Sequence, residues 1–555
     1  MGTSMELHAG DGRGSAGSKK SVVGEGKTPH VIESEVPSAD QRDAQALARL
    51  GKKPVLKRRF SFIAMLGFTC TVLVTWEVIP IIYVTGLTNG GTAGFAYSYL
   101  FALVGSLSIF TVLGEMASLA PTSGGQYHWT YMLAPASCRK FFSYIMGWLV
   151  ICGWQALVAS SAYLSANLIL TLVTMNNPGY SPTQWQGTLL YWALMALAII
   201  ANLYSSTILP KLEFFFLAVH ILGFFAFLIP MVYMCPDKAT STEVWTQFNN
   251  GGDWPTMALS VFVGLIGSVF ANNGTDCAVH MAEETRGADY VIPWSVVATS
   301  VLNGLLGLGT LLSMLYVTPD IEAVLDSPTG QLGFPFMQVV LDSVGSYSGA
   351  TAMISIVIAM FVFAVTAFLA TASRIVFAFG RDKGLPFWQT MAKVHPKTAI
   401  PNYAIYVITG VACFVGIINL GSATAFNIIL SIGISSLYSS YTITELLLLW
   451  RRIRGDIRKP SEMSGHTWEA NELVWGPFHI PGVLGIALNA FAVCYGTIVI
   501  IFCFFPTTVN PDAAHMNWAC LITAAVIFFA IAYYLIYAKK VYQGPVVEIA
   551  PYQIS

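Results

Sequence analysis

Charged residues are scarce in this chain, and their scarcity excludes most soluble architectures. Asp, Glu, Lys and Arg make up only 10% of the 555 residues, whereas 55% are hydrophobic. Soluble globular domains carry about 25% charged residues. The composition therefore predicts a polytopic membrane protein rather than a soluble domain with a single anchor. The formal net charge of −1 gives no sign of nucleic-acid binding.

Patterns that would indicate other chemistries are also missing. The nine Cys form no C-x-x-C pair, so neither a disulfide framework nor a metal site is indicated. There is no H-E-x-x-H motif, nucleophile elbow or phosphate-binding loop, so we expect neither an enzyme nor an organic cofactor. No cleavable signal peptide is visible, and residues 1–59 have the polar composition of a disordered tail.

Long apolar runs fill the remainder of the chain. A bilayer core needs about 20 apolar helical residues to cross it, and runs of that length predict about twelve transmembrane helices. Their approximate limits are 60–88, 91–118, 141–173, 187–207, 212–234, 256–282, 291–317, 347–379, 401–420, 424–449, 480–505 and 516–538. We group them as a first set of five (60–234), a second set of five (256–449) and two C-terminal helices (480–538).

The distribution of Lys and Arg predicts the orientation. The segments "KKPVLKRR", "CRKFF", "GRDKGLPFWQTMAKVHPK", "RRIRGDIRK" and "AKK" all fall on one side, whereas loop 318–346 is acidic and has no basic residue. By the positive-inside rule the basic side is cytoplasmic. Both termini, including the tail 539–555, are therefore expected in the cytoplasm.

Two of the predicted spans carry interruptions. The first contains Glu77, followed by Pro80, which removes a backbone donor and clashes with the carbonyl of residue 76. The simple interpretation is a glutamate near the outer helix end; the alternative is a broken helix that lines a cavity. The sixth span contains Asn272, Asn273 and Gly274, which form helices poorly, and then Asp276.

Breaks in the first helix of each set of five are expected for an inverted-repeat transporter. In such folds the N-termini of half-helices face an anionic substrate group, and unwound carbonyls receive cations, so two breaks suit a zwitterion. His220, inside the fifth span, is either a packed core histidine or a proton-linked switch. Glu115, Glu284 and Arg374 lie near inner helix ends, where we expect gate or structural roles.

Three motifs carry a family resemblance. "GEMASLAPTSGGQYHW" (Gly114 to Trp129) resembles the G-E-x-x-S-x-x-P-x-x-G-G-Q-Y signature of the amino acid–polyamine–organocation superfamily. "EETRGADYVIP" (Glu283 to Pro293) and "ASRIVFAFGRDKGLP" (Ala372 to Pro386) are similar to that family's loops after helices six and eight. "GLTNGG" and "TDCAVHMAEE" carry a finer resemblance to its fungal amino acid/choline branch, which includes GABA and choline permeases.

The resemblance implies a plasma-membrane permease with a five-plus-five inverted repeat, alternating access and proton-driven uptake. It places Thr75, Trp76, Glu77 and Val78 at the unwound part of helix one. It places Ala271, Asn272, Asn273, Gly274 and Thr275, with Asp276 next to them, at the unwound part of helix six. Relatives usually have Gly or Ser at the first break. The bulkier Thr-Trp-Glu here favours an ammonium near Glu77, or Glu77 as the proton carrier.

The sequence therefore predicts a proton symporter that imports an amino acid or a related amine such as GABA. Glu77 and residues 272–276 would frame the substrate, and Glu77 or His220 would carry the proton, the only coupling ion expected. Two alternatives stay open: a choline or polyamine permease of the same fold, and a nutrient receptor that binds without transport.

Overall fold

The computed structural model describes residues 50, 52, 55–204, 209–318, 321–418, 423–459, 473–513 and 515–545. Within these ranges every regular element is a helix, apart from three isolated bridges. The chain is thus an all-α polytopic membrane protein, as its composition predicts. Most of the predicted N-terminal tail and the last ten residues of the C-terminal tail lie outside the described residues.

Nine helical segments in the described ranges are long and apolar enough to cross a bilayer. They are Phe62–Ile81, α5 (Gly91–Leu119), α7 (Arg139–Asn176), α8 (Gln184–Tyr204), α9 (Leu209–Met234), α13 (Ala288–Val317), α17 (Tyr347–Arg381), α21 (Gly482–Phe502) and Ala519–Val541, which comprises α22 (Ala519–Tyr533), η3 (Tyr534–Ala538) and α23 (Lys539–Val541). The shorter α11 (Met257–Ala271) and α19 (Asn402–Ile418), and the longer α20 (Ala423–Arg454), occupy the other predicted runs. A count of twelve crossings stays a prediction.

The first broken helix consists of α2 (Phe62–Leu73), α3 (Thr75–Ile81) and α4 (Tyr83–Thr88). The break lies at Val74, whose φ of 39° and ψ of 41° are left-handed, an unusual conformation for a β-branched residue. Thr75–Val78, predicted to be unwound, instead form the first turn of α3. Pro80 lies inside α3, six residues after the break, so it does not cause the interruption.

The second broken helix consists of α11 and α12 (Cys277–His280), followed by η1 (Ala282–Glu284). Helix α11 ends at Ala271, and residues 272–276 are not helical, in agreement with the weak helix propensity of "NNGTD". A Cβ added to Gly274, which has φ +112°, would lie 3.7 Å from Val72 and 3.9 Å from Trp154. The second break therefore packs directly against α2 and α7.

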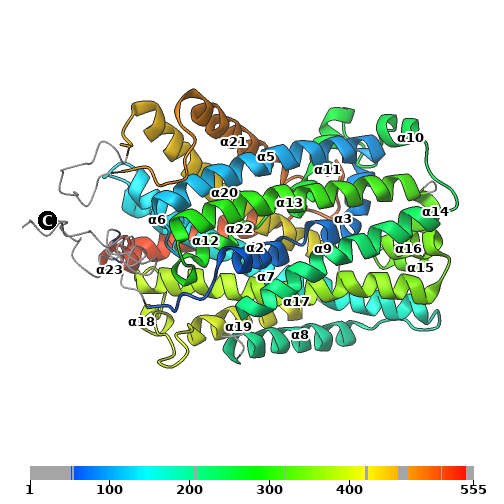
Figure 1. Ribbon diagram of the computed structural model, residues 1–555, viewed down its shortest axis with the longest axis horizontal. Coiled ribbons are helices and arrows are strands. Elements are labelled where there is room, and N and C mark those ends of the chain that lie inside the picture. The colour runs from blue at the N-terminus through cyan, green and yellow to red at the C-terminus, as the bar shows by residue number, and fades with distance from the viewer. Residues whose placement is uncertain are drawn as a thin grey trace, which may run out of the picture. The chain divides into compact units, whose positions relative to one another are not determined.

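The spanning helices lie side by side along the horizontal direction of Figure 1. Helix α13 packs on α5, α2 and α3, whereas α7 packs on α17 and α20. The two broken helices are enclosed between these groups, as the complete burial of Trp76 on α3 and Cys277 on α12 shows.

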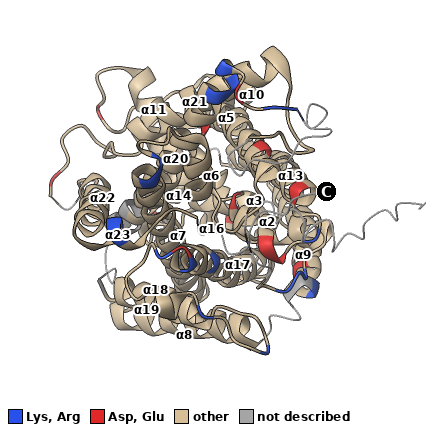
Figure 2. Ribbon diagram, turned by 90° about the vertical axis from the view of Figure 1, so that its left-hand side faces the viewer, with Lys and Arg blue, Asp and Glu red and all other residues tan. Residues whose placement is uncertain are grey.

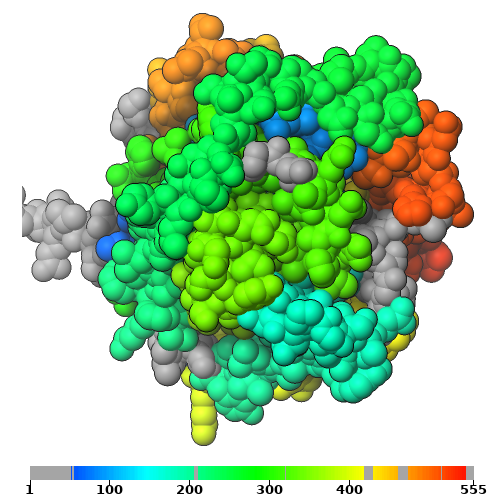
Figure 3. Space-filling view, turned by 90° about the vertical axis from the view of Figure 1, so that its right-hand side faces the viewer, coloured from blue at the N-terminus to red at the C-terminus, as the bar shows by residue number. Residues whose placement is uncertain are grey.

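The two ends of this bundle differ in charge and cover. At the left in Figure 1 lie α6 (Gln126–Leu133), α12, α18 (Trp388–Met391) and α23; we call this the inner face, since the basic segments gather there and are seen in Figure 2. At the opposite, outer face lie α10 (Ser241–Thr246), α14 (Ile321–Leu325), α15 (Pro328–Gln331) and α16 (Phe336–Val344). Figure 3 shows these connecting segments covering the outer ends of the helices.

Candidate functional site

A small cavity lies between the two helix breaks. It leaves about 10 Å³ for the centre of a water molecule, room for roughly one water. Its lining comes from both broken helices, α7 and α17: Val72, Leu73, Val74, Val78, Phe270, Asn273, Leu157, Ser160, Ser161, Leu164, Phe361 and Phe368. The space is therefore closed around a central site that must widen to admit an organic molecule.

Two lining residues carry buried polar atoms that have no hydrogen-bond partner among the described residues: Ser161 through its Oγ, and Asn273 through both amide atoms. In and next to the two breaks, Thr75 Oγ1 and Thr275 Oγ1 also have none within the described ranges. Leaving such a group unsatisfied costs about 1–3 kcal/mol. A polar ligand would supply the missing partners of Ser161 on α7 and of Asn273 in the second break.

The backbone at the start of α3 adds further donors. The first backbone hydrogen bond of α3 runs from Val78 N to Val74 O at 2.9 Å. The N–H groups of Thr75, Trp76 and Glu77 thus begin the helix without a carbonyl partner inside it, at the positive end of its dipole. Val78 faces the cavity, whereas the Trp76 side chain turns away and its indole N–H donates to the His220 carbonyl at 3.1 Å.

Glu77 also faces away from the cavity. Its Oε1 lies 2.8 Å from Nδ1 of His220 on α9, and Nε2 of the same imidazole lies 2.5 Å from Oδ1 of Asn303 on α13. All three side chains are fully buried, and Glu77 Oε2 has no hydrogen-bond partner among the described residues. The arrangement joins α3, α9 and α13 through one histidine.

This triad is suited to holding a proton. A protonated imidazole donates from both nitrogens, so it would satisfy Glu77 and Asn303 at once. A neutral imidazole has a single N–H and would satisfy only one acceptor, unless the Asn303 amide turns its unpartnered Nδ2 toward the ring. The protonation state therefore decides how tightly the three helices are joined.

Asp276, in the second break, contacts a different set of groups. Its Oδ2 accepts from Gln126 Nε2 at 2.8 Å, and its Oδ1 accepts from Tyr441 OH on α20 at 2.6 Å. His280 Nε2 lies 3.5 Å from the same carboxylate. The neighbouring Asn272 amide donates to its own helix, to Ser268 O at 3.0 Å. Asp276 thus links the break to α6 and α20 rather than to the cavity.

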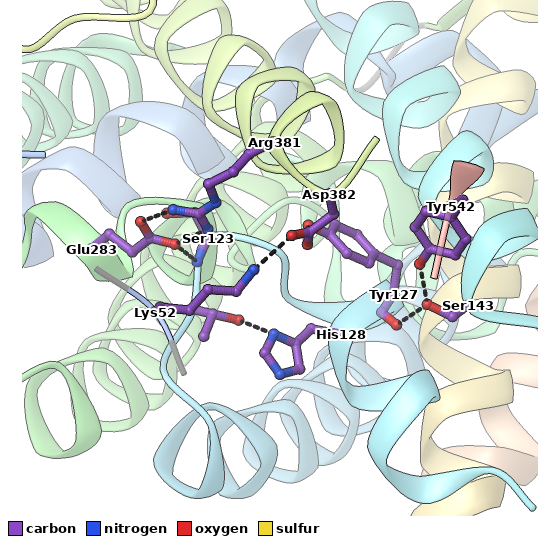
Figure 4. Close-up of polar contacts among 10 residues, drawn as sticks. Lys52, Ser123, Tyr127, His128, Ser143, Glu283, Arg381, Asp382 and Tyr542 are labelled. Carbon is purple, nitrogen blue, oxygen red and sulfur yellow. Dashed lines mark hydrogen bonds and ion pairs between the residues drawn. The ribbon is translucent and has the colours of Figure 1, made fainter. Parts of the chain in front are cut away.

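Ion pairs and hydrogen bonds join several segments at the inner face (Figure 4). Lys52 Nζ lies 2.6 Å from Asp382 Oδ1, and Tyr127 OH donates to the other oxygen at 2.8 Å. Arg381 binds both oxygens of Glu283, at 2.8 and 2.7 Å. The end of the predicted tail thus packs against the bundle.

The C-terminal segment joins the same group of contacts. Tyr542 OH lies 2.6 Å from Ser143 Oγ, which donates to the Tyr127 carbonyl at 2.8 Å. Burial would raise the pKa of the Glu283 carboxyl, but the Arg381 guanidinium holds it below its ordinary value. Burial, together with the Lys52 charge, lowers the pKa of His128 on α6 to about 3.

The three expected gate residues also lie near this face. Arg374 Nε pairs with Glu284 Oε1 at 2.8 Å, whereas Glu115 Oε2 pairs with Arg452 Nη2 at 2.7 Å. Sequence reasoning missed Asn303, Ser161 and the Lys52–Asp382 pair. The lone Asn303 within an apolar run was the one available signal, because isolated polar residues in spans make interhelical contacts.

Comparison with known proteins agrees with this architecture. The profile described as amino acid permease matches residues 60–527. A Macrophomina phaseolina protein named as a candidate amino acid/polyamine transporter is 26% identical over 82% of this chain and 96% of its own length. The Saccharomyces cerevisiae choline transporter is 25% identical over 92% of this chain and 86% of its own length. The Arabidopsis thaliana amino-acid permease BAT1 is 25% identical over 93% of this chain and 98% of its own length. The chain therefore belongs to the amino acid permease family of integral membrane transporters.

Proposed function

We propose that this permease imports a small amino acid or related amine, such as GABA, across the plasma membrane together with a proton, by alternating access. The observation that carries the proposal is the buried Glu77–His220 pair at the start of α3, 2.8 Å between Oε1 and Nδ1. It lies beside the first break, yet none of its atoms faces the central cavity. Substrate and proton would therefore occupy opposite sides of one short helix.

This placement supports coupling between the two. Val78 of α3 and the preceding Val74 line the cavity, whereas Trp76 and Glu77 contact α9. A substrate that binds the start of α3 would shift the helix relative to His220 and Asn303, and so change the proton affinity of the pair. Linkage requires the reverse as well: protonation must change substrate affinity by the same factor.

The lining of the cavity supports a substrate with no more than one positive charge. No side chain among the described lining residues is charged, and three are Phe. A polyamine would bury several ammonium groups without an opposing carboxylate, which is unfavourable. A zwitterion could direct its carboxylate to the unpartnered Ser161 hydroxyl and Asn273 amide, and its ammonium to the aromatic faces.

Choline is the second candidate substrate, and the same aromatic residues favour it. A quaternary ammonium binds aromatic faces and needs no hydrogen-bond acceptor. Phe270, Phe361 and Phe368 line the cavity, and the Trp154 ring lies 6.0 Å from that of Phe368. One named relative transports choline, which supports keeping this alternative.

Uptake into proteoliposomes tests the proposal. Purified protein would be reconstituted with an alkaline interior and supplied with labelled GABA, choline, a neutral α-amino acid or spermidine. We expect accumulation of GABA that collapses with a protonophore and persists when sodium is replaced by potassium. Accumulation of choline alone would change the substrate, and dependence on sodium would overturn proton coupling.

Two further readouts separate transport from binding. Ligand-induced thermal stabilisation without any flux would make the protein a receptor. Glu77→Gln should remove the response of uptake to the pH gradient. The matched control, Glu213→Gln, should keep that response. Glu213 is also a buried carboxylate, on α9, but it lies beside Thr71 and not beside His220.

A further inference from the structure

A second cavity lies at the inner face, far from the helix breaks in sequence. It leaves about 160 Å³ for the centre of a water molecule, more than the central cavity. The end of α20 and the segment before α21 form it, with Arg452, Lys459, Trp475, His479, Pro481 and Ile486 among its lining residues. The proposed transport cycle assigns no role to this cavity.

The cavity lies within a dense group of positive charges. Residues 451–459 contain Arg451, Arg452, Arg454, Arg458 and Lys459, and Asp456 is the one acidic residue of that stretch. Asp456 is already paired with Arg451 at 2.8 Å. Within residues 451–459, basic side chains therefore outnumber acidic ones by five to one.

Arg452 has donors to offer inside this cavity. Its side chain is only 6% exposed, and Nη2 binds Glu115 Oε2 at 2.7 Å. Its Nε and Nη1 have no hydrogen-bond partner among the described residues. The guanidinium carbon lies 4.8 Å from the Trp475 ring, on which His479 stacks at 5.4 Å. The aromatic rings hold the guanidinium in place, so that its remaining N–H groups can bind a planar or tetrahedral oxyanion.

The position of the cavity points to the membrane as the source of that anion. Gly482 lines the cavity and begins α21, and the next residues, Val483 and Leu484, are 81% and 70% exposed. On α20, Ile453, next to Arg452, is 64% exposed. Exposed apolar side chains in a membrane protein contact lipid tails, so the cavity opens where the tails give way to headgroups.

We propose that this cavity binds the phosphate-bearing headgroup of an anionic lipid from the cytoplasmic leaflet. Basic pockets at the cytoplasmic ends of spanning helices are suited to such headgroups. The phosphate would bind Arg452 Nε and Nη1 and the ammonium of Lys459, and the acyl chains would lie along Val483 and Leu484. Since Arg452 also binds Glu115, the lipid would join the ends of α5, α20 and α21.

Thermal stabilisation of the full chain in detergent tests the proposal. The probes are dioctanoyl phosphatidylinositol 4-phosphate, dioctanoyl phosphatidylcholine and inorganic phosphate. We expect the first to stabilise the protein at concentrations at least about fivefold lower than phosphatidylcholine, because one basic contact near a membrane surface is worth about that factor. Equal effects of the two lipids would overturn the proposal. Stabilisation by inorganic phosphate at the same concentration would assign the site to a free anion and overturn the lipid source.

Variants locate the effect. Lys459→Gln, an exposed position, should weaken the preference for the phosphorylated lipid about fivefold. His479→Gln, the second cavity variant, changes the residue that stacks on the Trp475 ring and should also weaken the preference for the phosphorylated lipid. The matched control is Lys393→Gln: Lys393 is also basic, lies at the inner face beside Tyr403, and does not line the cavity. An equal loss in the control, or no loss in either cavity variant, would overturn the site.

Discussion

Two buried carboxylates lie at the two helix breaks, and they are held in different ways. Asp276 accepts one hydrogen bond at each oxygen, from Gln126 and from Tyr441. Glu77 contacts His220 through one oxygen, and its second oxygen has no partner among the described residues. Both lie next to a histidine, so residue type alone does not distinguish them.

The different hydrogen-bond partners of Asp276 and Glu77 indicate different roles for the two carboxylates. Asp276 accepts from two donors on different helices, Gln126 of α6 and Tyr441 of α20, so both of its oxygens serve to join helices. Glu77 shares its histidine with Asn303, and a proton can sit on either group without stranding a donor. We therefore assign Asp276 to holding α12 against α6 and α20, and Glu77 to the proposed proton coupling.

The largest expected effect follows from Glu77→Gln. Gln keeps the size of the side chain but cannot ionise, so His220 loses its charged partner. We expect gradient-driven uptake to fall by at least about a hundredfold, the loss typical when an acid–base group is removed. Exchange of labelled for unlabelled substrate without a pH gradient should persist, and it is measured in the same vesicles. Normal gradient-driven uptake would erase the distinction between the two carboxylates.

Asp276→Asn should affect stability instead of coupling. The Asn amide would direct its Nδ2 donor toward Gln126 or Tyr441, leaving one buried donor unpaired. We expect the free energy of unfolding to fall by about 2 kcal/mol, measured by denaturation in detergent. The pH midpoint of uptake should stay unchanged. A shifted midpoint would show that Asp276 also titrates during transport.

The comparison also shows how far sequence reasoning reaches. The apolar runs predicted the spans because about 20 residues must cover the bilayer core. The second break was predicted because Asn272, Asn273 and Gly274 are weak helix formers. For the first break the sequence points to Pro80, whereas the chain breaks at Val74. No helix or strand propensity predicts a left-handed valine, because a β-branched residue rarely adopts that conformation.

The orientation of side chains was also beyond the sequence. Glu77 and Val78 are adjacent, yet one faces α9 and the other the cavity. A helix turns about 100° per residue, so the depth of a residue in the bilayer says nothing about which neighbour it faces. The partner of Glu77 lies 143 residues away and belongs to no local motif.

Each of the two carboxylates has a neighbouring histidine, His220 beside Glu77 and His280 beside Asp276, and we expect smaller effects from replacing these. His220→Gln removes the charged hydrogen bond to Glu77, and such bonds contribute about 1.5–3 kcal/mol. We expect at least about a tenfold loss of gradient-driven uptake and a flatter pH profile. His280→Gln is the matched change beside Asp276: it removes a 3.0 Å bond from Nδ1 to the Ser123 carbonyl. Uptake should fall less than about fivefold, with the pH profile kept. If the pH profile of uptake flattened equally in both variants, the assignment of proton coupling to the Glu77 side would be contradicted.

The smallest expected effect concerns His128, a neighbour in sequence of the Gln126 that binds Asp276. His128 lies on α6, two residues after Gln126, and its pKa is lowered to about 3. It is neutral in the folded protein but takes up a proton below about pH 6.5 once unfolded.

The contribution of His128 to stability is therefore complete above pH 6.5 and is lost as the pH falls toward 3. Between pH 6.5 and 5.5 the contribution of His128 to the free energy of unfolding should drop by about 1 kcal/mol. Glu283, whose pKa is also lowered, acts in the same sense only below about pH 4.5. The comparison with His128→Gln isolates the histidine from the other titrating groups. Melting curves of the wild type and of His128→Gln at both pH values measure the difference, and an identical pH dependence in the two proteins would contradict it.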